Sequence, residues 1–309
     1  MARVTSSVKL EEKKFKRAEQ AADWLNHAAE LNFKDACRQG MLLTLPLVGE
    51  LVVGADLHGN RKNFQAIQTF CDLPHHPDRQ LVLLGDWIHA LDLIQTGKDF
   101  SCLLLEEVAR LKIQFPSQVH LLLGNHELSE FQGRHIFKDG KLLNFFFQRG
   151  LQLFYGESGA EVFRQALDNF IASLPIAVRT QTKIWISHST PEKSVAKKIP
   201  LTFFAQNELI FQDRKQLKIL EEVVWGRDFS EKTARFLSEL WDTEIFIVGH
   251  EKCAEGYQVP NTHHIILDST DHYGTLVHLK LHQPYAQRGI VRQIRYLETL
   301  DTPIVIDEE

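Results

Sequence analysis

Short apolar runs that alternate with helix-like stretches are the feature that most restricts how this chain can fold. Continuous apolar runs of this length are typical of strands that are buried on both faces. Strands alternating with helices predict a layered α/β architecture. The predicted strands are Leu51–Val53, Leu81–Leu84, Val119–Leu123, Ile184–Ile186, Ile245–Val248 and Ile265–Leu267. The predicted helices between them are Phe64–Phe70, Cys102–Phe115, Glu161–Ser173 and Lys232–Trp241.

The first 47 residues have a different character. Between Leu10 and Leu31, apolar residues recur at roughly helical spacing with lysine and glutamate between them, which predicts an amphipathic helix. We expect this helix to pack or to cover a site, without a part in chemistry. A length of 309 residues fits one large domain or two medium ones. We therefore divide the chain into an N-terminal helical extension, residues 1–47, and a single domain, residues 48–309.

Composition restricts the partners and the compartment. The formal net charge is −5, which argues against a nucleic-acid partner because such partners demand a basic face. The four cysteines form no C-x-x-C pair, so neither a disulfide framework nor a zinc–thiolate site is expected. No apolar run approaches the ~20 residues that span a bilayer. We expect a cytoplasmic protein with reduced thiols and no membrane partner.

Ligand-type side chains follow five of the predicted strands, several of them introduced by glycine. In open α/β sheets, ligands bind outside the carboxyl ends of the strands. Glycine there lets the backbone turn sharply and approach an ion or a phosphate closely. One such residue alone is usually a turn residue or a helix cap, but turn chemistry does not place histidines in several loops at once. The side chains are Asp56, His58, Asp86, Asn125, His126, His188 and His250.

The combination of these side chains predicts a metal centre. Carboxylate, imidazole and amide oxygen without thiolate suit Mn, Fe or Zn. Two ions that share a bridging carboxylate use this number of ligands naturally, whereas one ion would keep no open position. Two metals about 3.5–4 Å apart form the usual clamp for attack at phosphorus. We expect a two-metal phosphoesterase whose metal ligands are Asp56, His58, Asp86, Asn125, His188 and His250.

The motifs resemble those of the calcineurin-like metallophosphoesterases, and specifically of the PPP-type serine/threonine phosphatases. That family shows GDxHG, GDxxDRG, GNHE, HGG and a final GH or AH, in this order. The corresponding segments here are GADLHG at 54–59, GDWIHA at 85–90, GNHE at 124–127, SHS at 187–189 and VGHEKCAEGY at 248–257. The resemblance implies a central β-sandwich flanked by helices, in α/β/β/α layers, with the metals at one edge of the sandwich.

The resemblance also implies a role for each matching residue. A metal-bridging hydroxide would attack phosphorus, and His126 would donate a proton to the leaving-group oxygen. Such proton transfer typically contributes ~10²–10⁴-fold to the rate. Glu127 would support the site without taking part in the reaction. The first metal would be held by Asp56, His58 and Asp86, and the second by the bridging Asp86 with Asn125, His188 and His250.

The second motif departs from the family. Ala90 stands where the family has an arginine that binds phosphate through two N–H groups. His89 replaces the aspartate that orients the GNHE histidine, and a histidine beside His126 disfavours a second positive charge there. Asp92, nearby in the sequence, is a candidate substitute. The chain therefore either takes a different phosphate ester or has lost turnover while keeping its metals. The intact metal-ligand positions favour the first.

Other residues are candidates for binding the phosphate. Arg227, in VWGRD, resembles a family segment that precedes the last metal histidine, although a solvated surface charge explains it equally well. Arg61 follows the first motif at an expected helix start, where backbone N–H groups favour anions. Tyr273, in STDHYG, resembles a late family loop with a phosphate-facing tyrosine. The metal ligand Asn125 is also expected to contact the substrate.

The leading functional hypothesis is a phosphomonoesterase such as a serine/threonine protein phosphatase, with a phosphorylated protein or small molecule as substrate. One alternative is a dinucleoside-polyphosphate or nucleotide hydrolase, because the bacterial enzymes of that kind share these motifs. A second alternative is a metal-retaining binding protein without catalysis, for which the changes at His89 and Ala90 would be signs of decay.

Overall fold

The computed structural model describes residues 2–91, 97–205 and 214–300. Each of the four helices predicted between the strands lies inside an observed helix, with at most one residue beyond its end. The helices are α1 (Ala2–Phe33), α2 (Arg61–Cys71), α4 (Cys102–Gln114), α5 (Asn125–Gln132), α6 (Leu143–Ser173), α7 (Lys193–Ala196), α8 (Leu201–Phe204), α9 (Arg214–Val224), α10 (Glu231–Trp241) and α11 (Gln287–Val291), with a 3-10 turn, η2, at Leu297–Thr299.

The strands form sheets of seven, five and two strands. They are β1 (Arg38–Gln39), β2 (Leu42–Thr44), β3 (Glu50–Gly54), β4 (Arg79–Leu83), β5 (Val119–Leu121), β6 (Phe137–Lys138), β7 (Lys141–Leu142), β8 (Ala177–Arg179), β9 (Ile184–Ser187), β10 (Ile245–Val248), β11 (Tyr257–Gln258), β12 (His264–Leu267), β13 (Thr275–Lys280) and β14 (Ile294–Tyr296). The larger sheets have the orders β1-β2-β8-β9-β10-β12-β11 and β14-β13-β3-β4-β5. Within them, β3, β4 and β5 are parallel, as are β9, β10 and β12.

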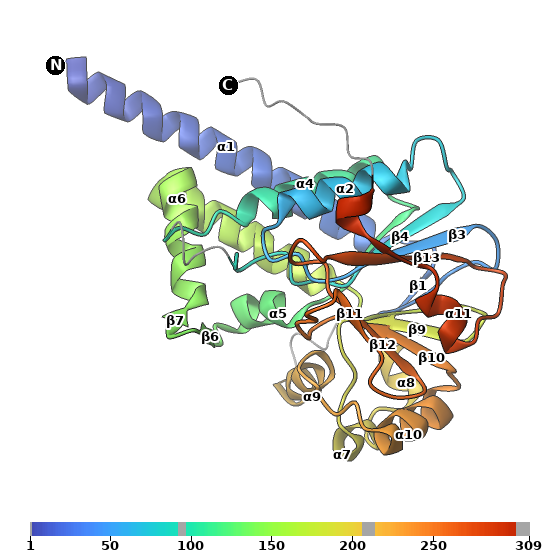
Figure 1. The fold of residues 1–309 in the computed structure, drawn as a ribbon. Helices are drawn as coiled ribbons and strands as arrows, with labels where there is room; N and C mark the ends of the chain where they lie inside the picture. Colours follow the sequence, from blue (N-terminus) through green and yellow to red (C-terminus); the bar gives the residue numbers. More distant parts are fainter. Residues whose placement is uncertain (1, 92–96, 206–213, 301–309) are drawn as a thin grey trace.

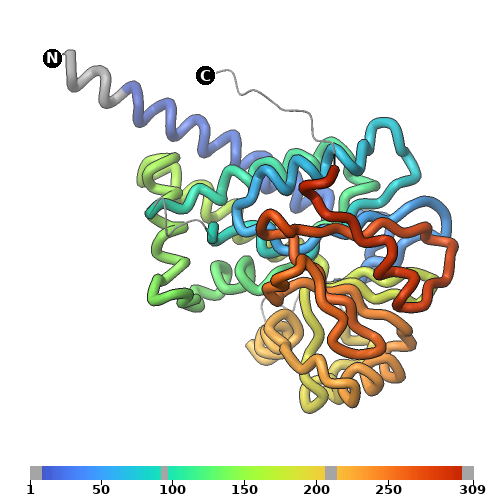
Figure 2. The backbone as a smooth tube through the Cα atoms, in the orientation of Figure 1, coloured from blue at the N-terminus to red at the C-terminus, as the bar shows by residue number. Residues whose placement is uncertain are grey.

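The two large sheets pack face to face, and helices cover the outer face of each (Figure 1). Helices α2 and α4 lie over the five-stranded sheet, and α1 packs against α4 and α6. Helices α8 and α10 lie on the seven-stranded sheet. The late strand β13 pairs with the early strand β3, so distant parts of the chain lie side by side (Figure 2). This arrangement confirms the predicted α/β fold with a central β-sandwich between helical layers.

Side chains along β3 alternate between the two halves of the core. Leu51 and Val53 pack against Ile186 and other residues between the sheets, whereas Val52 packs with Phe64 in the layer under the helices. All five side chains are fully buried. A strand covered on both faces needs apolar residues at every position, so the apolar run is continuous and does not alternate.

The N-terminal segment joins the core through its helix and its strands. The helix predicted between Leu10 and Leu31 lies within α1. Strand β2 pairs in parallel with β8, which places residues 42–44 in the seven-stranded sheet. The division of the chain between residues 47 and 48 stays a prediction.

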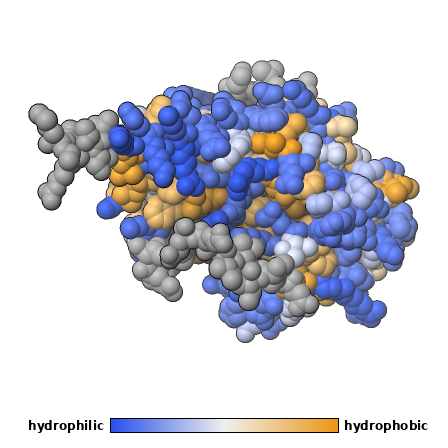
Figure 3. All heavy atoms as spheres, turned by 90° about the horizontal axis from the view of Figure 1, so that it is seen from above, coloured by the Kyte–Doolittle hydropathy of each residue, from blue (hydrophilic) through white to orange (hydrophobic). Residues whose placement is uncertain are grey.

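The face that carries α1, α2 and α4 is largely hydrophilic (Figure 3). Among the described residues, no helix combines the length and the apolar character that a membrane crossing requires. The four cysteines are free thiols. Cys71, Cys102 and Cys253 are buried, and Cys37 is half-buried.

Candidate metal centre

The predicted ligand loops meet at one edge of the sandwich. Strands β3, β4 and β5 of the five-stranded sheet lead into the loops after 54, 83 and 121, and strands β9 and β10 of the other sheet lead into the loops after 187 and 248. Because the carboxyl ends of parallel strands lie at the same edge, five loops from two sheets converge there. They form a pocket of about 230 Å³. Among the residues lining the pocket are Asp56, His58, Asp86, Asn125, His126 and His250.

One group of ligand atoms brings together Asp86, Asn125, His188 and His250. The Asn125 Oδ1 atom lies 2.8 Å from His188 Nε2 and 2.8 Å from His250 Nδ1. The His188 Nε2 atom lies 3.6 Å from Asp86 Oδ2. His188 Nδ1 donates a hydrogen bond to the Leu84 carbonyl at 3.0 Å, so its Nε2 presents a lone pair to this group. The His250 Nδ1 atom lies 3.1 Å from His188 Nε2, so ligand atoms of three residues converge here. Lone pairs that converge in this way fit a metal ion.

A second group consists of His58, Asp86 and His126. His58 Nε2 and His126 Nε2 each lie 3.7 Å from Asp86 Oδ2. His58 Nδ1 donates to the Ile88 carbonyl at 3.0 Å, which again turns the Nε2 lone pair inward. Asp86 Oδ2 is the atom that both groups approach. A carboxylate in this position has the placement that a ligand bridging two metals requires.

Asp56 stands slightly apart from both groups. Its two carboxylate oxygens accept the backbone N–H of His250, each at 3.1 Å, and its Oδ1 lies 3.8 Å from His188 Nδ1. The carboxylate nevertheless lines the pocket. The structure therefore brings Asp56 to the site without placing it among the ligand atoms around His58.

The backbone at the centre is strained. His58, Asp86, His89 and His250 have positive φ values of 43°, 53°, 61° and 71°, a region that residues other than glycine rarely adopt. Such strain typically gathers where the surrounding structure imposes a functional geometry. Close approach adds to the constraint, because a β-carbon on Gly124 would lie 2.3 Å from Asp86 Oδ1. The glycine of the GNHE motif is thus required by packing against the Asp86 carboxylate.

Burial sets the protonation of these groups. It raises the pKa of Asp56 to about 8, and it raises the pKa of Asp86 well above the ordinary value, with the Glu127 charge adding to the effect. Burial lowers the pKa of His58 to about 3 and also lowers that of His250. The imidazoles are therefore neutral and offer lone pairs. A bound cation would offset the cost of two ionised carboxylates in the same small volume.

Glu127 supports the loop that carries Asp86. Its Oε2 accepts the backbone N–H of Asp86 at 2.7 Å, and its Oε1 accepts that of Trp87 at 2.8 Å. The side chain is fully buried. This placement agrees with the expectation that Glu127 holds the site without contacting the substrate.

Three cationic side chains line the pocket, and sequence reasoning identified one of them. Arg227 lies at the rim and pairs with Glu251. Lys138 and Lys252 also line the pocket. Partial burial, and then the neighbouring Lys252 charge, lower the pKa of Lys138. Lys138 lies on β6, just before the Asp-Gly turn of the β6–β7 hairpin, a turn signal visible in the sequence.

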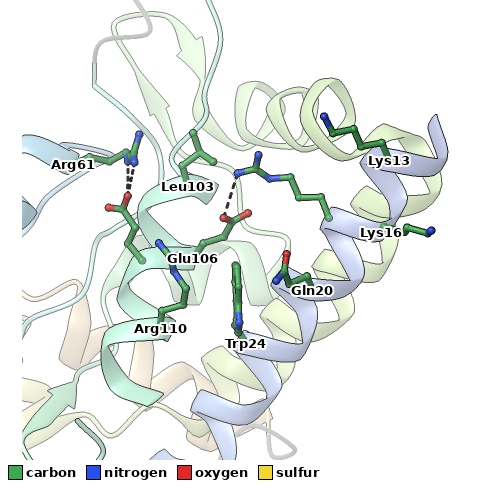
Figure 4. A pocket seen from close by; sticks show the side chains of 10 residues that line it. Lys13, Lys16, Gln20, Trp24, Arg61, Leu103, Glu106 and Arg110 are labelled. Carbon is green, nitrogen blue, oxygen red and sulfur yellow. Dashed lines mark hydrogen bonds and ion pairs between the residues drawn. The ribbon is translucent and has the colours of Figure 1, made fainter. Parts of the chain in front are cut away.

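Two other candidates do not meet the pocket. Arg61 is the first residue of α2 and lies beside α4, where its Nε donates to Glu107 at 2.9 Å (Figure 4). Arg61 lines a separate pocket of about 420 Å³, and no histidine lines that pocket. Tyr273 is 46% exposed and packs on the His272 ring. Asp92, the candidate carboxylate for His126, lies outside the described residues.

The structure provides a carboxylate that sequence reasoning missed. His89 Nδ1 lies 2.8 Å from His126 Nδ1, and His89 Nε2 lies 2.9 Å from Glu130 Oε1. His89 therefore links His126 to an acidic residue one helical turn further along α5. The spacing of His126 and Glu130 by four residues was the available signal, since such residues share a helix face.

The profile of the calcineurin-like phosphoesterases matches residues 51–254, which include every strand-end loop described above. The chain belongs to this family. It is therefore a hydrolase, and its histidine and aspartate groups are consistent with the binuclear metal site typical of calcineurin-like phosphoesterases.

Relatives of this phosphoesterase include serine/threonine phosphatases. It is 28% identical over 227 residues to a probable serine/threonine-protein phosphatase of Encephalitozoon cuniculi, an alignment covering 68% of this chain and 44% of the relative. It is 29% identical over 139 residues to a serine/threonine-protein phosphatase 7 long form homolog of Arabidopsis thaliana, covering 45% of this chain and 9% of that protein. The chain thus matches less than half the length of these curated relatives.

Solved structures share the fold of this phosphoesterase. A protein serine/threonine phosphatase from Saccharomyces cerevisiae, described as similar to human phosphatase PP5, superposes with a TM-score of 0.63 at 16% identity and covers 93% of this chain and 92% of its own. A cold-active protein-tyrosine phosphatase of a psychrophilic Shewanella species superposes with a TM-score of 0.55 at 13% identity, covering 82% and 80%. At these identities the likeness concerns the fold alone.

Proposed function

We propose that this phosphoesterase is a two-metal phosphomonoesterase that acts on phosphoserine or phosphothreonine in proteins. The observation that carries the proposal is the position of Asp86 Oδ2, which lies within 3.7 Å of ligand nitrogens from both groups. The distant similarity to serine/threonine phosphatases supports the substrate class.

The residues would hold two ions of Mn, Fe or Zn. When bound, the ions would supply an activated water and would neutralise charge on the phosphoryl oxygens. The tautomers of His58 and His188 are already fixed by backbone carbonyls, so both rings are oriented for ligation. One ion would be held by His58 and Asp86, with Asp56 as a third ligand because its carboxylate lines the same pocket. The other ion would be held by Asp86, Asn125, His188 and His250.

His126 is the proposed general acid. Its Nε2 faces the pocket near Asp86, and its ring lies 4.5 Å from that of His58. Burial, and then the neighbouring His58, lower its pKa, so the metal-free ring is neutral. A phosphate dianion in the pocket favours the protonated ring, which can then donate from Nε2 to the leaving-group oxygen.

Phosphate binding falls to the cations at the rim. Lys138, Arg227 and Lys252 would replace the arginine that the second motif lacks at Ala90, and Asn125 would contribute its amide.

Metal analysis and an aryl phosphate assay test the two-metal site. We expect about two metals per chain and Mn²⁺-dependent turnover. Asp86→Asn removes the shared carboxylate charge and should abolish turnover and reduce the metal content. Asp72→Asn, in an exposed ion pair with His75, is the matched control and should behave as wild type. Normal turnover by Asp86→Asn would refute the proposal.

Parallel assays on a phosphopeptide and on a dinucleoside tetraphosphate test the substrate class. Faster hydrolysis of the phosphopeptide is expected. Faster hydrolysis of the dinucleoside tetraphosphate would instead identify the protein as a nucleotide hydrolase. Stoichiometric metal without turnover on either substrate would identify a binding protein that has lost catalysis.

A further inference from the structure

A buried row of three side chains connects the proposed acid to the helix layer. From the pocket outward it runs from His126 to His89 and then to Glu130, through contacts of 2.8 Å and 2.9 Å. His89 is fully buried, and the Glu130 side chain is only 7% exposed. His126 and Glu130 both project from α5, and His89 comes from the loop after β4.

The hydrogen bonds of Glu130 set the direction of the whole row. Three N–H groups point at its carboxylate: His89 Nε2 at 2.9 Å, Asn144 Nδ2 at 2.6 Å and Gln148 Nε2 at 3.1 Å. A carboxylate that receives three donors acts as an acceptor, so His89 donates from Nε2. With the His89 proton on Nε2, its Nδ1 lone pair faces His126, which donates from its own Nδ1 at 2.8 Å. The remaining nitrogen of His126, Nε2, is left facing the pocket.

The row is held in place from several sides. Asn144 and Gln148 lie four residues apart on α6, so both reach Glu130 from the same helix face. The His89 ring meets the edge of Phe147, with centroids 5.7 Å apart. The backbone N–H of His89 donates to Ser101 Oγ at 3.1 Å. With ring, backbone and carboxylate all fixed, His89 has one orientation available.

We propose that His89 and Glu130 are positioning residues that fix the tautomer and the orientation of His126. The proposal rests on the proposed function, in which His126 donates the proton to the leaving group. In this chain the carboxylate that supports the acid acts through an intervening histidine, which is why the exchange of aspartate for histidine in the second motif is tolerated. Neither residue contacts the substrate, so each acts through His126.

The leaving group provides the readout. A phosphate ester with a poor leaving group needs proton donation, whereas p-nitrophenolate leaves without it. His89→Ala and Glu130→Gln should therefore lower kcat for phenyl phosphate on the order of 10–100-fold, as loss of a supporting partner typically does. Their kcat for p-nitrophenyl phosphate should change much less, and KM should stay near wild type for both esters. Gln165→Ala, on the exposed part of α6, serves as a control.

A double-mutant cycle separates positioning from simple packing. Because Asp Oδ occupies the same place along the side chain as His Nδ1, His89→Asp should accept the His126 Nδ1–H directly and retain turnover of phenyl phosphate. In that background Glu130→Gln should have little further effect. If Glu130→Gln costs the same in both backgrounds, Glu130 does not act through His89 and the proposal fails.

Nuclear magnetic resonance of the metal-free protein provides a readout that does not depend on activity. With ¹⁵N-labelled histidine, His126 should show a proton on Nδ1 in the wild type and a mixture of tautomers in His89→Ala. Metal content should be equal in all variants. An unchanged tautomer in His89→Ala would overturn the proposal.

The His126→Asn variant separates a failure of the positioning proposal from a failure of the proposed function. It should keep its metals and lose turnover of phenyl phosphate by about 10²–10⁴-fold. If it does so while His89→Ala and Glu130→Gln behave as wild type, the positioning role of His89 and Glu130 is wrong and the role of His126 stands. If His126→Asn turns over phenyl phosphate normally, the acid itself is misassigned.

Discussion

Individual cations at the pocket rim would, under the proposed function, compensate for the arginine absent at Ala90. Lys138 reaches the pocket from the β6–β7 hairpin, and Lys252 follows the final metal-ligand loop. Lysine charges on flexible stems bind phosphate as point charges, without the two-pronged geometry of an arginine. Such a set of lysines would bind phosphate with less demand on the orientation of the ester.

Lys138→Ala should weaken substrate binding with little effect on the chemical step. Loss of one partly solvated charge contact should raise KM for a phosphopeptide roughly 5–10-fold while kcat stays within about twofold. Steady-state kinetics measure both values. Lys141→Ala, on the paired strand β7 and outside the pocket lining, is the matched control. A fall in kcat with KM unchanged would show that Lys138 acts on the reaction instead.

Residues that follow strands were predictable, and residues that reach the site from elsewhere were not. Asp86 and His250 each follow an apolar run and one glycine, so the strand pattern places each of them at the carboxyl end of a strand. Lys138 arrives from a hairpin outside the large sheets, and Glu130 acts through His89. Contacts of this kind depend on how distant parts of the chain pack together, which the order of residues does not show directly. Arg61 illustrates the opposite case. It begins a helix as predicted, but its side chain pairs with Glu107 and does not line the metal pocket.

Among the elements, α1 is attached to the core at its C-terminal end. Asp35, just after this helix, accepts from Lys112 Nζ at 3.2 Å and from His120 Nδ1 at 2.9 Å. The three side chains are at most 5% exposed. Lys112 belongs to α4 and His120 to β5, so one carboxylate ties the N-terminal helix to a helix and a strand of the sandwich.

Asp35→Asn should destabilise the protein by about 3 kcal/mol at neutral pH, because it leaves Lys112 buried without a counter-charge. Urea unfolding followed by circular dichroism measures the loss. The exposed Asp242, paired with Lys183, provides the control Asp242→Asn, which should leave the unfolding midpoint nearly unchanged. An equal midpoint for Asp35→Asn and wild type would show that the cluster contributes no net stability.

The same variant has a predicted pH dependence. Burial opposes ionisation of Asp35, but the His120 hydrogen bond and the Lys112 charge hold its pKa well below the ordinary 3.8. A group with a depressed folded pKa stabilises the protein above its unfolded pKa and loses that contribution as the pH falls. The stability difference between wild type and Asp35→Asn should therefore shrink below about pH 4.

The sequence predicted where helices and strands lie better than it predicted where they begin and end. The helix predicted at Glu161–Ser173 is the second part of α6, which begins at Leu143 and bends at Gly156. Gly156 has φ 75° and ψ 169°, and a β-carbon there would meet Glu11 of α1 at 2.5 Å. The helix is interrupted there by a positive φ that residues with a β-carbon rarely adopt. The periodicity of apolar residues does not report an interruption of this kind.

At the scale of the whole molecule, the proposed metal site joins the two sheets. Asp86 and Asn125 follow strands of the five-stranded sheet, whereas His188 and His250 follow strands of the seven-stranded sheet. The strand pattern predicted a layered fold from the sequence. The pairing of sheets was implied by the family motifs, because parallel runs alone do not show how strands divide between two sheets.

A metal ion held by both sheets should stabilise the fold as a unit. At a free Mn²⁺ concentration 100 times its Kd, each site adds about 2.7 kcal/mol to the free energy of unfolding, provided that the unfolded chain does not bind the ion. For a chain of this length that corresponds to roughly 4 °C in Tm per site. Differential scanning calorimetry with added Mn²⁺ or a chelator measures the shift. Lys138→Ala, which removes no proposed ligand, should keep it, whereas Asp86→Asn should lose most of it because Asp86 is shared by both ligand groups. An undiminished shift in Asp86→Asn would mean that Mn²⁺ stabilises the protein from another place, and that the two sheets are held together by their apolar interface alone.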